Sequence, residues 1–412
     1  MTLAKFNGSL GLTRLIRAEY GLLVGSLMIM AGDLSLAEDA LQEALAQALE
    51  QRPSKGQPKK PAAWILTVAR RRLVDQLRKA KHRNADLVIQ ALQNAHLTQY
   101  DDVYDSSDIP DHRLELMFTC CHPALAPEVQ VALTLKVVCG LSIGQIARAY
   151  LTSEAAMSKR ISRAKFKIKH AGIGYKVPQG AALEQRLPSV LAVIYLIYNE
   201  SYSAYEGQTL TQEDLALEAI YLAKLMHGML PHASVTGLLA LLLLHDSRRS
   251  ARSSQSQTYI PLKLQDRRLW DQEKMAQGTE LVKSALVEGQ LGIYQVQAAI
   301  SALHSNSKSW EATDWPQIVG LYKVLYDMEP SPVFLLNYCV ALFYAGSIAH
   351  AYQEVIALYV HLHDYQPYQA AKAEMEAELG DIEAAKKSYT LAIGLSKNDA
   401  ERQFLKRQLK AL

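Results

Sequence analysis

The chain has 412 residues, of which 49% are hydrophobic, and its net charge is only +3. This is enough apolar material for a buried core and for two to three domains. Four cysteines are too few for a disulfide framework, and no apolar run reaches the roughly 20 residues that span a bilayer. A segment after Arg17 loosely resembles a signal peptide, but Glu19 interrupts the approach to it. The composition therefore argues against a disulfide-rich secreted protein and a helical membrane protein, and it predicts a cytoplasmic one.

The charge is distributed unevenly between the two halves of the chain. Residues 1–180 contain 24 Lys or Arg and 16 Asp or Glu, a net charge of +8. Residues 181–412 contain 20 basic and 25 acidic residues, a net charge of −5. The first half is therefore expected to have an anionic partner, and the acidic half is a candidate competitor with that partner for the basic surface.

Almost the whole chain has a helical pattern. Apolar residues recur at three- and four-residue spacing, and the alternation typical of strands is scarce. Loops are expected at Arg52–Pro61, Asp101–Asp111 and Tyr175–Gly180, where helix-breaking or charged residues cluster. The pattern predicts an all-α fold.

Residues 140–168 have the form of a helix-turn-helix. Ser142 and Ser153 are placed to cap two helices, and residues 151–153 form the short turn between them. In the first helix Ile143, Ile146 and Ala147 are expected to face inward. In the second helix one apolar stripe is expected, made of Met157, Ile161, Ala164 and Ile168. The opposite face is predicted to contact DNA through short and basic side chains, namely Ser158, Lys159, Ser162, Arg163 and Lys165. The alternative is an amphipathic helix whose charged face is merely solvated.

A second basic segment lies near the N-terminus. Residues 52–83 contain 11 Lys or Arg and a single acidic residue, Asp75. This density suits contacts with phosphates and a salt-sensitive affinity for DNA. A basic helix without a partner is the alternative.

The adjacent thiols of Cys120 and Cys121 precede His122 and resemble a metal or nucleophile site. Structural zinc, however, usually needs four ligands with C-x₂₋₄-C spacing, and no second Cys/His cluster is evident. No base and orienting acid can be assigned to a catalytic thiol either. Small buried thiols are therefore expected, with no metal, no cofactor and no catalytic residue.

Taken together, these motifs resemble bacterial sigma factors of the extracytoplasmic-function type. Region four of that family is matched by "GLSIGQIA", Ser153, Glu154, Met157 and "RISRAK". Two positions depart from the family pattern. Gln145 stands where a Glu is usual, and Leu151 stands where the turn often has Gly.

Region two of the same family is matched by "AEDALQ" and by "PAAWILTVARRRLVDQLRK". The resemblance implies that the acidic helix binds core RNA polymerase through Glu38, Asp39 and Gln42. It also implies that the second helix faces promoter DNA, with Arg70, Arg71 and Arg78 in contact. The expected domains are region two at 1–84, an acidic linker at 85–112, region four at 113–175 and a helical domain at 181–412.

The sequence motifs of the C-terminal half are less specific than those of regions two and four. Two segments within 333–395 share a register, with Gly346 or Gly380 at the turn, Ala351 or Ala385 in the second helix, and Tyr359 or Tyr389 near its end. They are expected to form tetratricopeptide-like hairpins. Two further motifs, "LQDRRLW" and "YQVQAAISALH", either form a polar cleft or cap and bridge helices, and the second interpretation is favoured.

The resemblance implies a sigma factor that directs promoter recognition and transcription initiation, with a C-terminal domain that regulates it directly or through a partner or ligand. One alternative is a helical-repeat regulator that binds DNA without polymerase. The other is an enzyme in the C-terminal domain, with Glu200, Asp266 or His304 as acid or base. No spacing supports that enzyme, and the protein is expected not to be one.

Overall fold

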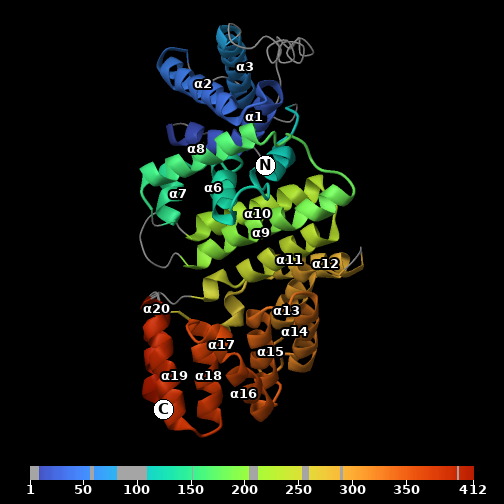
Figure 1. The fold of residues 1–412 in the computed structure, drawn as a ribbon, viewed down its shortest axis with the longest axis vertical. Coiled ribbons are helices and arrows are strands. Elements are labelled where there is room, and N and C mark those ends of the chain that lie inside the picture. Colours follow the sequence, from blue (N-terminus) through green and yellow to red (C-terminus); the bar gives the residue numbers. More distant parts are fainter. Residues whose placement is uncertain are drawn as a thin grey trace. The chain divides into compact units, whose positions relative to one another are not determined.

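The computed structural model describes residues 9–55, 60–80, 109–150, 152–203, 212–252, 259–287, 291–396 and 399–412. Within these ranges the regular secondary structure consists of α-helices and short 3₁₀ helices, which confirms the predicted all-α fold (Figure 1). None of the helices in the described ranges has the length and apolar character needed to cross a membrane.

The chain forms two compact units, residues 1–196 and residues 197–412. The boundary falls inside α9 (Ala181–Ser203). The C-terminal domain expected from the sequence begins at residue 181, whereas α9 up to Leu196 belongs to the first unit. Arg186 anchors this part of α9, because its guanidinium donates to the carbonyl oxygen of Phe118 in α5 (Arg113–Cys120).

The first unit contains two groups of helices. The first group packs around the buried side chains Leu23, Leu27, Leu41, Ile65 and Leu73. Its members are α1 (Ser9–Ala31), α2 (Leu34–Lys55) and α3 (Pro61–Ala80). The second group consists of α5, α6 (Pro127–Val137), α7 (Ile143–Ala149) and α8 (Glu154–His170).

The helix-turn-helix of α7 and α8 is formed as predicted. Ser142 and Gln145 make a reciprocal capping box, in which the Ser142 amide donates to Gln145 Oε1 (2.9 Å) and the Gln145 amide donates to Ser142 Oγ (3.1 Å). Gln145 therefore performs the capping role of the Glu that is usual in the family. Ser153 Oγ accepts from the Ala156 amide (3.2 Å). Leu151 lies outside the described residues.

The packing of this motif also follows the sequence pattern closely. The four residues of the apolar stripe on α8 are all buried. On α7, Ile146 and Ala147 are buried, and Ile143 is only half-buried.

The second unit is a succession of helices in which most neighbours along the chain are also neighbours in space (Figure 1). They are the end of α9, α10 (Gln212–Met229), α11 (Ala233–Asp246), α12 (Gln272–Val287), α13 (Ile293–Asn306), α14 (Trp315–Met328), α15 (Pro332–Tyr344), α16 (Ile348–Ala357), α17 (Tyr359–Leu362), α18 (Gln366–Glu378), α19 (Ile382–Leu395) and α20 (Asp399–Ala411). The apolar run from Leu238 to Leu244 lies in α11, where all of its side chains are buried.

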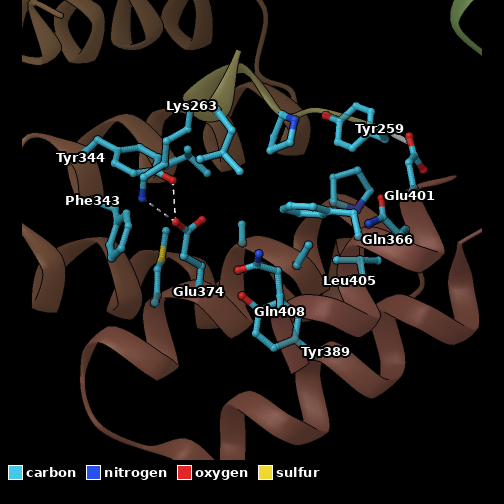
Figure 2. A pocket seen from close by; sticks show the side chains of 18 residues that line it. Tyr259, Lys263, Phe343, Tyr344, Gln366, Glu374, Tyr389, Glu401, Leu405 and Gln408 are labelled. Atoms are coloured by element: carbon cyan, nitrogen blue, oxygen red, sulfur yellow. Dashed lines mark hydrogen bonds and ion pairs between the residues drawn. The ribbon is translucent and has the colours of Figure 1, made fainter. Parts of the chain in front are cut away.

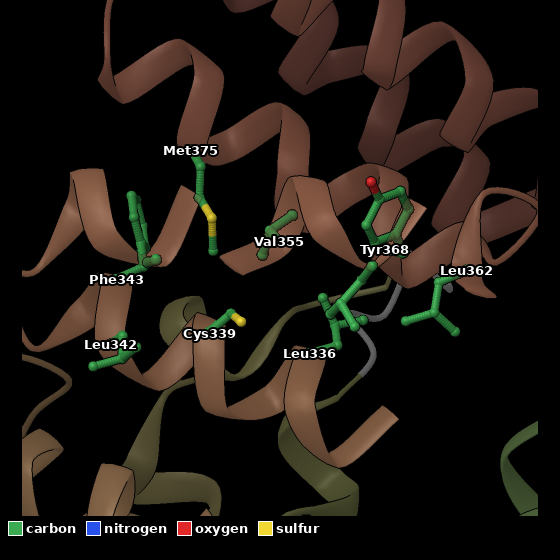
Figure 3. Close-up of a cluster of buried hydrophobic side chains, with 10 residues drawn as sticks. Leu336, Cys339, Leu342, Phe343, Val355, Leu362, Tyr368 and Met375 are labelled. Atoms are coloured by element: carbon green, nitrogen blue, oxygen red, sulfur yellow. The ribbon is translucent and has the colours of Figure 1, made fainter. Parts of the chain in front are cut away.

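The expected hairpins near the C-terminus are α15–α16 and α18–α19. Gly346 (φ 90°) and Gly380 (φ 84°) lie in the left-handed region at the two turns, which other residues adopt only with strain. Ala351 and Ala385 are buried in the second helices. Figure 3 shows the core that joins the first hairpin to α18, with Cys339, Val355 and Met375 among its buried side chains.

The repeat is irregular at one position. Tyr389 is buried, but Tyr359, its counterpart in the register, is 58% exposed and begins the extra short helix α17. This helix lies between the two hairpins and moves Tyr359 out of the core.

The motif "LQDRRLW" bridges helices in the second unit. Asp266 caps the short helix η4 (Arg267–Leu269) by accepting from the Arg268 amide (3.0 Å). Arg267 Nη1 donates to the carbonyl oxygens of His304 (2.5 Å) and Ser307 (2.6 Å), at the C-terminal end of α13. These contacts agree with the cap-and-bridge interpretation of the sequence.

His304, from the second motif, is packed in an aromatic cluster. Its ring stacks on Trp310, with centroids 6.0 Å apart, and meets Trp315 edge-on at 5.3 Å. Burial lowers the pKa of His304 to about 3, and the charges of Arg248 and Arg267 act in the same direction. A neutral, packed imidazole of this kind supports the fold of the second unit.

We predict that this imidazole makes the second unit sensitive to acid. Because the folded pKa lies below the unfolded value of about 6.5, unfolding takes up a proton, and stability falls as the pH drops below about 6.5 towards 3. His304→Phe keeps a ring on Trp310 but cannot titrate. It should reduce the loss of stability between about pH 7.5 and pH 5 by about 2 kcal/mol.

Thermal unfolding followed by tryptophan fluorescence measures this effect, because Trp270, Trp310 and Trp315 lie in the second unit. His350→Phe is the control, since the His350 side chain is 57% exposed. An unchanged pH dependence in His304→Phe would contradict the prediction.

Candidate functional site

The acidic residues expected to bind polymerase lie on α2 in two different environments. Asp39 and Gln42 are exposed. Glu38 is buried, with only 5% of its side chain accessible. The three residues assigned together from the sequence therefore do not form one exposed surface in this structure.

The Glu38 carboxylate is held by side chains from three other helices. Lys165 of α8 forms an ion pair with it, and Lys136 Nζ of α6 lies 3.9 Å away. Tyr20 of α1 donates its hydroxyl to Glu38 Oε1 at 2.9 Å. A second ion pair joins Asp33, just before α2, to Lys169 of α8 at 2.6 Å. We call these ion pairs and the Tyr20 bond the α2–α8 contact.

The electrostatics of the α2–α8 contact reflect its partial burial. Burial lowers the pKa of Lys136, and the neighbouring charge of Lys165 lowers it further, whereas the Glu38 carboxylate opposes both. For Asp33, burial raises the pKa, but the bonds from Lys169 and from the Ser35 and Leu36 amides outweigh it and leave the pKa below its usual value. Lys136 and Asp33 therefore both depend on their charged partners to compensate for lost hydration.

Close backbone packing accompanies these ion pairs. A Cβ atom on Gly21 of α1 would lie 2.4 Å from the carbonyl oxygen of Val138, so only glycine permits this approach to the end of α6. The Tyr175 hydroxyl donates to the carbonyl oxygens of Gly25 (3.2 Å) and His112 (3.0 Å). The two expected regions thus share an interface that includes close backbone packing, hydrogen bonds and ion pairs.

A cavity of about 470 Å³ borders the α2–α8 contact. Asp39 and Gln42 line it on the α2 side, and Ser142 and Gly144 line it on the α7 side. The exposed part of the acidic surface therefore lies directly beside the N-terminal end of the helix-turn-helix.

The residues of α8 that were expected to contact DNA divide into two sets. Lys159, Ser162 and Arg163 are exposed, and Ser158 is half-buried. Lys165 is turned towards α2, with 17% of its side chain accessible, and binds Glu38. Glu38, which the sequence assigned to polymerase, and Lys165, which it assigned to DNA, thus bind each other.

The basic residues of α3 are more accessible. Arg71 and Arg78 are exposed, and Arg70 is half-buried. Arg78 lies 4.0 Å from Asp75 in a pair that is well exposed, so this interaction restrains it only weakly.

Cys120 and Cys121 are buried, as expected. Burial raises the pKa of Cys121 to about 12 and that of Cys120 well above the usual value. Both thiols therefore stay protonated near neutral pH, which is unsuitable for a nucleophile. Among the described residues no three His, Cys, Asp or Glu side chains come together as a metal site.

Two segments of the first unit match known protein families. Residues 15–83 match Sigma-70 region 2, and residues 115–168 match Sigma-70 region 4. The chain belongs to the sigma-70 family. Its two regions are those of extracytoplasmic-function sigma factors, as the sequence motifs predicted, and its role is promoter recognition in transcription initiation with core RNA polymerase. Neither sigma region belongs to an enzyme family.

The remaining comparisons concern the longer chain. Residues 186–286 match a family of unknown function, DUF6596. This sigma factor is 37% identical over 390 residues to an uncharacterized protein of Rhizobium meliloti (strain 1021), and the match covers 94% of this chain and 92% of that protein. No solved structure matches the chain.

Several residues of the α2–α8 contact were not identified from the sequence. Asp33, Tyr20, Lys136 and Lys169 lie on four separate segments, and no spacing relates them. One partial signal exists for Asp33, because an Asp before a helix is typical of an N-cap. Its side chain does accept from the Ser35 amide at 2.8 Å.

We predict that the Glu38 carboxylate stabilises the packing of α2 against α8. Glu38→Gln would leave the ammonium groups of Lys165 and Lys136 without their shared counter-charge, at a cost of about 3 kcal/mol. Hydrogen exchange of the α2 and α8 amides should accelerate accordingly. Adding Lys165→Met should recover part of the loss, because it removes one of the uncompensated charges.

Glu43→Gln is the matched control, since Glu43 is an exposed carboxylate on α2 whose bond to Gln76 lies at the surface. Equal exchange rates in Glu38→Gln and Glu43→Gln would show that the buried carboxylate has no special role.

Proposed function

We propose that α2 binds core RNA polymerase through Glu38, Asp39 and Gln42, and that α8 reads promoter DNA. The observation that carries this proposal is the exposed edge of α8. Lys159, Ser162 and Arg163 lie on a helix whose N-terminus is capped and whose opposite face is fully packed. Such a helix can enter the major groove without disturbing the core.

Further residues on α8 and α3 are also proposed to contact DNA. Ser158 permits close approach, and Lys165 becomes available only when it leaves Glu38. On α3, Arg70, Arg71 and Arg78 are proposed to contact the downstream part of the promoter. They supply positive charge along α3, which favours phosphate binding.

We infer that the α2–α8 contact opens when the sigma factor binds its partners. Glu38 and Lys165 each satisfy the charge of the other in the free protein, so neither can bind polymerase or DNA without breaking this pair. Polymerase and DNA would then have to replace the lost ion pairs with new ones. The free form is consequently a closed state with lower affinity for both partners.

The second unit is proposed to regulate transcription, in cis or through a partner or ligand. Its support is its size, since residues 197–412 form a compact unit beyond the two sigma regions. The protein is proposed to act in the cytoplasm, where RNA polymerase and DNA are found, and to act without enzyme chemistry. Asp266 and His304 have structural contacts, and the side chain of Glu200 lies outside those the structure describes.

The polymerase surface is tested by charge reversal at an exposed position. Asp39→Lys combined with Gln42→Ala should weaken binding to core polymerase at least about tenfold, because interfacial like charges are costly. Helicity should be unchanged, since both side chains are exposed. Binding is measured with purified core enzyme, and Glu43→Gln serves as the control on the same helix.

The opening of the α2–α8 contact is tested in the same assay. Asp33→Asn removes a carboxylate that is not assigned to polymerase, and it should raise the affinity about threefold by favouring the open form. Asp111→Asn is the control, because Asp111 pairs with Arg113 within its own segment.

Wild-type affinity for core polymerase in the combined Asp39→Lys and Gln42→Ala variant would refute the proposed polymerase surface. If the protein bound DNA but did not bind polymerase, the sigma-factor mechanism would be wrong. The alternative, a regulator that binds DNA without polymerase, would then be correct.

The promoter surface is tested with Arg163→Ala. If Arg163 reads a base edge, the substitution should cost about 1–3 kcal/mol and relax the preference at one promoter position. If it contacts phosphate alone, the loss should be equal on all sequences and the salt dependence should decrease.

Lys167→Ala is the matched control for Arg163. It lies on the same helix, but its ammonium donates to the Ala124 carbonyl oxygen in the loop before α6. A loss on promoter DNA that is no larger for Arg163→Ala than for Lys167→Ala would exclude α8 as the reading helix.

A further inference from the structure

A cavity of about 460 Å³ lies within the second unit. Helices α15, α18, α19 and α20 form its walls together with the segment from Tyr259 to Leu264 (Figure 2). We infer that this cavity binds a small uncharged aromatic molecule that carries an amide-like group, which both donates and accepts hydrogen bonds.

The size and the walls of the cavity suit a small molecule with an apolar body. The volume falls within the range of about 300–1,000 Å³ that is typical of such sites. Most of the lining residues are apolar or aromatic, and Ala370 and Ala371 of α18 leave the space open because their side chains are short. An apolar ligand would gain affinity by removing these walls from contact with water.

The aromatic side chains of the lining favour a ligand that contains a ring. Tyr344, Tyr389 and Phe404 come from three different helices, α15, α19 and α20. Phe404 also meets Tyr259 edge-on, with ring centroids 5.9 Å apart. Because aromatic rings attract one another in edge-on and offset arrangements, an aromatic body gains more here than an aliphatic body of the same size.

The charged side chains of the lining already have partners within the protein. Tyr344 donates its hydroxyl to Glu374 Oε1 at 2.7 Å, and Lys263 Nζ lies 3.5 Å from the same carboxylate oxygen. The Glu401 carboxylate, which Figure 2 shows apart from this pair, also has an interaction partner. A charged ligand would therefore lose hydration in the cavity without meeting an unpaired opposite charge, and this loss is costly. An uncharged ligand avoids that cost.

Two neutral polar side chains also line the cavity and select the polar group of the ligand. They are Gln366 of α18 and Gln408 of α20, and both are half-buried (Figure 2). A glutamine side chain donates through its NH₂ group and accepts through its carbonyl oxygen. A ligand amide can match both functions without carrying a charge. A few polar groups of this kind in an apolar pocket fix the orientation of a ligand and give it specificity.

Probes that differ from one another in a single feature test the inference on the full chain. 3-Phenylpropanamide has the inferred features, and a Kd on the order of 1 mM is expected for a molecule of this size. 3-Phenylpropanoate and 3-phenylpropylamine replace the amide with an anionic and a cationic group, and each should bind at least about tenfold more weakly. 3-Cyclohexylpropanamide replaces the aromatic ring and should bind about threefold more weakly. Saturation-transfer NMR and calorimetry measure these affinities.

Two variants locate the binding. Gln366→Met combined with Gln408→Met should weaken binding of 3-phenylpropanamide about threefold to tenfold, because the hydrogen bonds to its amide are lost. Ala370→Phe should fill the cavity and abolish binding of all the probes. The matched controls are Gln353→Met and Ala349→Phe, since both positions are exposed on α16 and lie outside the cavity lining. Thermal unfolding and circular dichroism show whether each variant is folded.

The inference is overturned if 3-phenylpropanamide does not bind at about 10 mM, or if either charged probe or the cyclohexyl amide binds as tightly. It is also overturned if the combined Gln366 and Gln408 variant, or a folded Ala370→Phe variant, binds 3-phenylpropanamide as the wild type does. If Ala370→Phe does not fold, the combined glutamine variant decides. These binding measurements do not involve polymerase or DNA, so their outcome is independent of the proposed sigma-factor contacts.

Discussion

The packing of the helices in the first unit depends on the bonds made by one buried carboxylate, that of Glu38. It lies on α2, yet its partners are Tyr20, Lys136 and Lys165, which come from three other helices. A carboxylate removed from water is tolerated only when such partners surround it. The position of α8 relative to α2 is therefore coupled to this one charge, and the close approach of Gly21 to the Val138 backbone adds tight packing between α1 and the end of α6.

Under the proposed mechanism, the same side chains have two roles. In the free protein, Glu38 and Lys165 compensate each other, whereas in the transcribing complex they are proposed to face polymerase and DNA. An ion pair suits such an exchange because its energy is recovered when each partner meets a new opposite charge. A purely apolar interface would instead leave exposed hydrophobic surface on opening. Under this proposal the charged residues stabilise the free form, and they can also exchange their ion pairs for bonds to polymerase and DNA.

The second unit combines helix-end bonds and aromatic packing with buried carboxylates such as Glu376, which pairs with Lys372 at 2.9 Å. Arg267 satisfies two carbonyl oxygens at the end of α13, which would otherwise lack partners within the helix. The tryptophan and histidine cluster then fills the space between α13, α14 and α15. Further along, α15, α18, α19 and α20 surround a cavity of about 460 Å³, in which the short side chains of Ala370 and Ala371 leave space.

Much of this protein could be predicted from its sequence, because the relevant forces act within a few residues along the chain. Helical periodicity determined the all-α fold and the apolar stripe from Met157 to Ile168. Local hydrogen bonds determined the caps at Ser142 and Ser153, and the turn glycines determined the hairpins at Gly346 and Gly380. The motifs of the two sigma regions are likewise contiguous, and for that reason they identified the family.

Only the tertiary structure decided which charged residues face partners and which face each other. The sequence placed Lys165 with Lys159 and Arg163, because all three are basic residues away from the apolar stripe. The fold separates them, because a helix surface has two polar flanks and α2 covers only one of them. The division of α9 between the two units, the exposure of Tyr359 and the cavity beside Glu401 depend in the same way on contacts between distant segments. Burial and charge pairing are properties of the assembled surfaces, and a periodic pattern in one segment carries no information about which other segment will cover it.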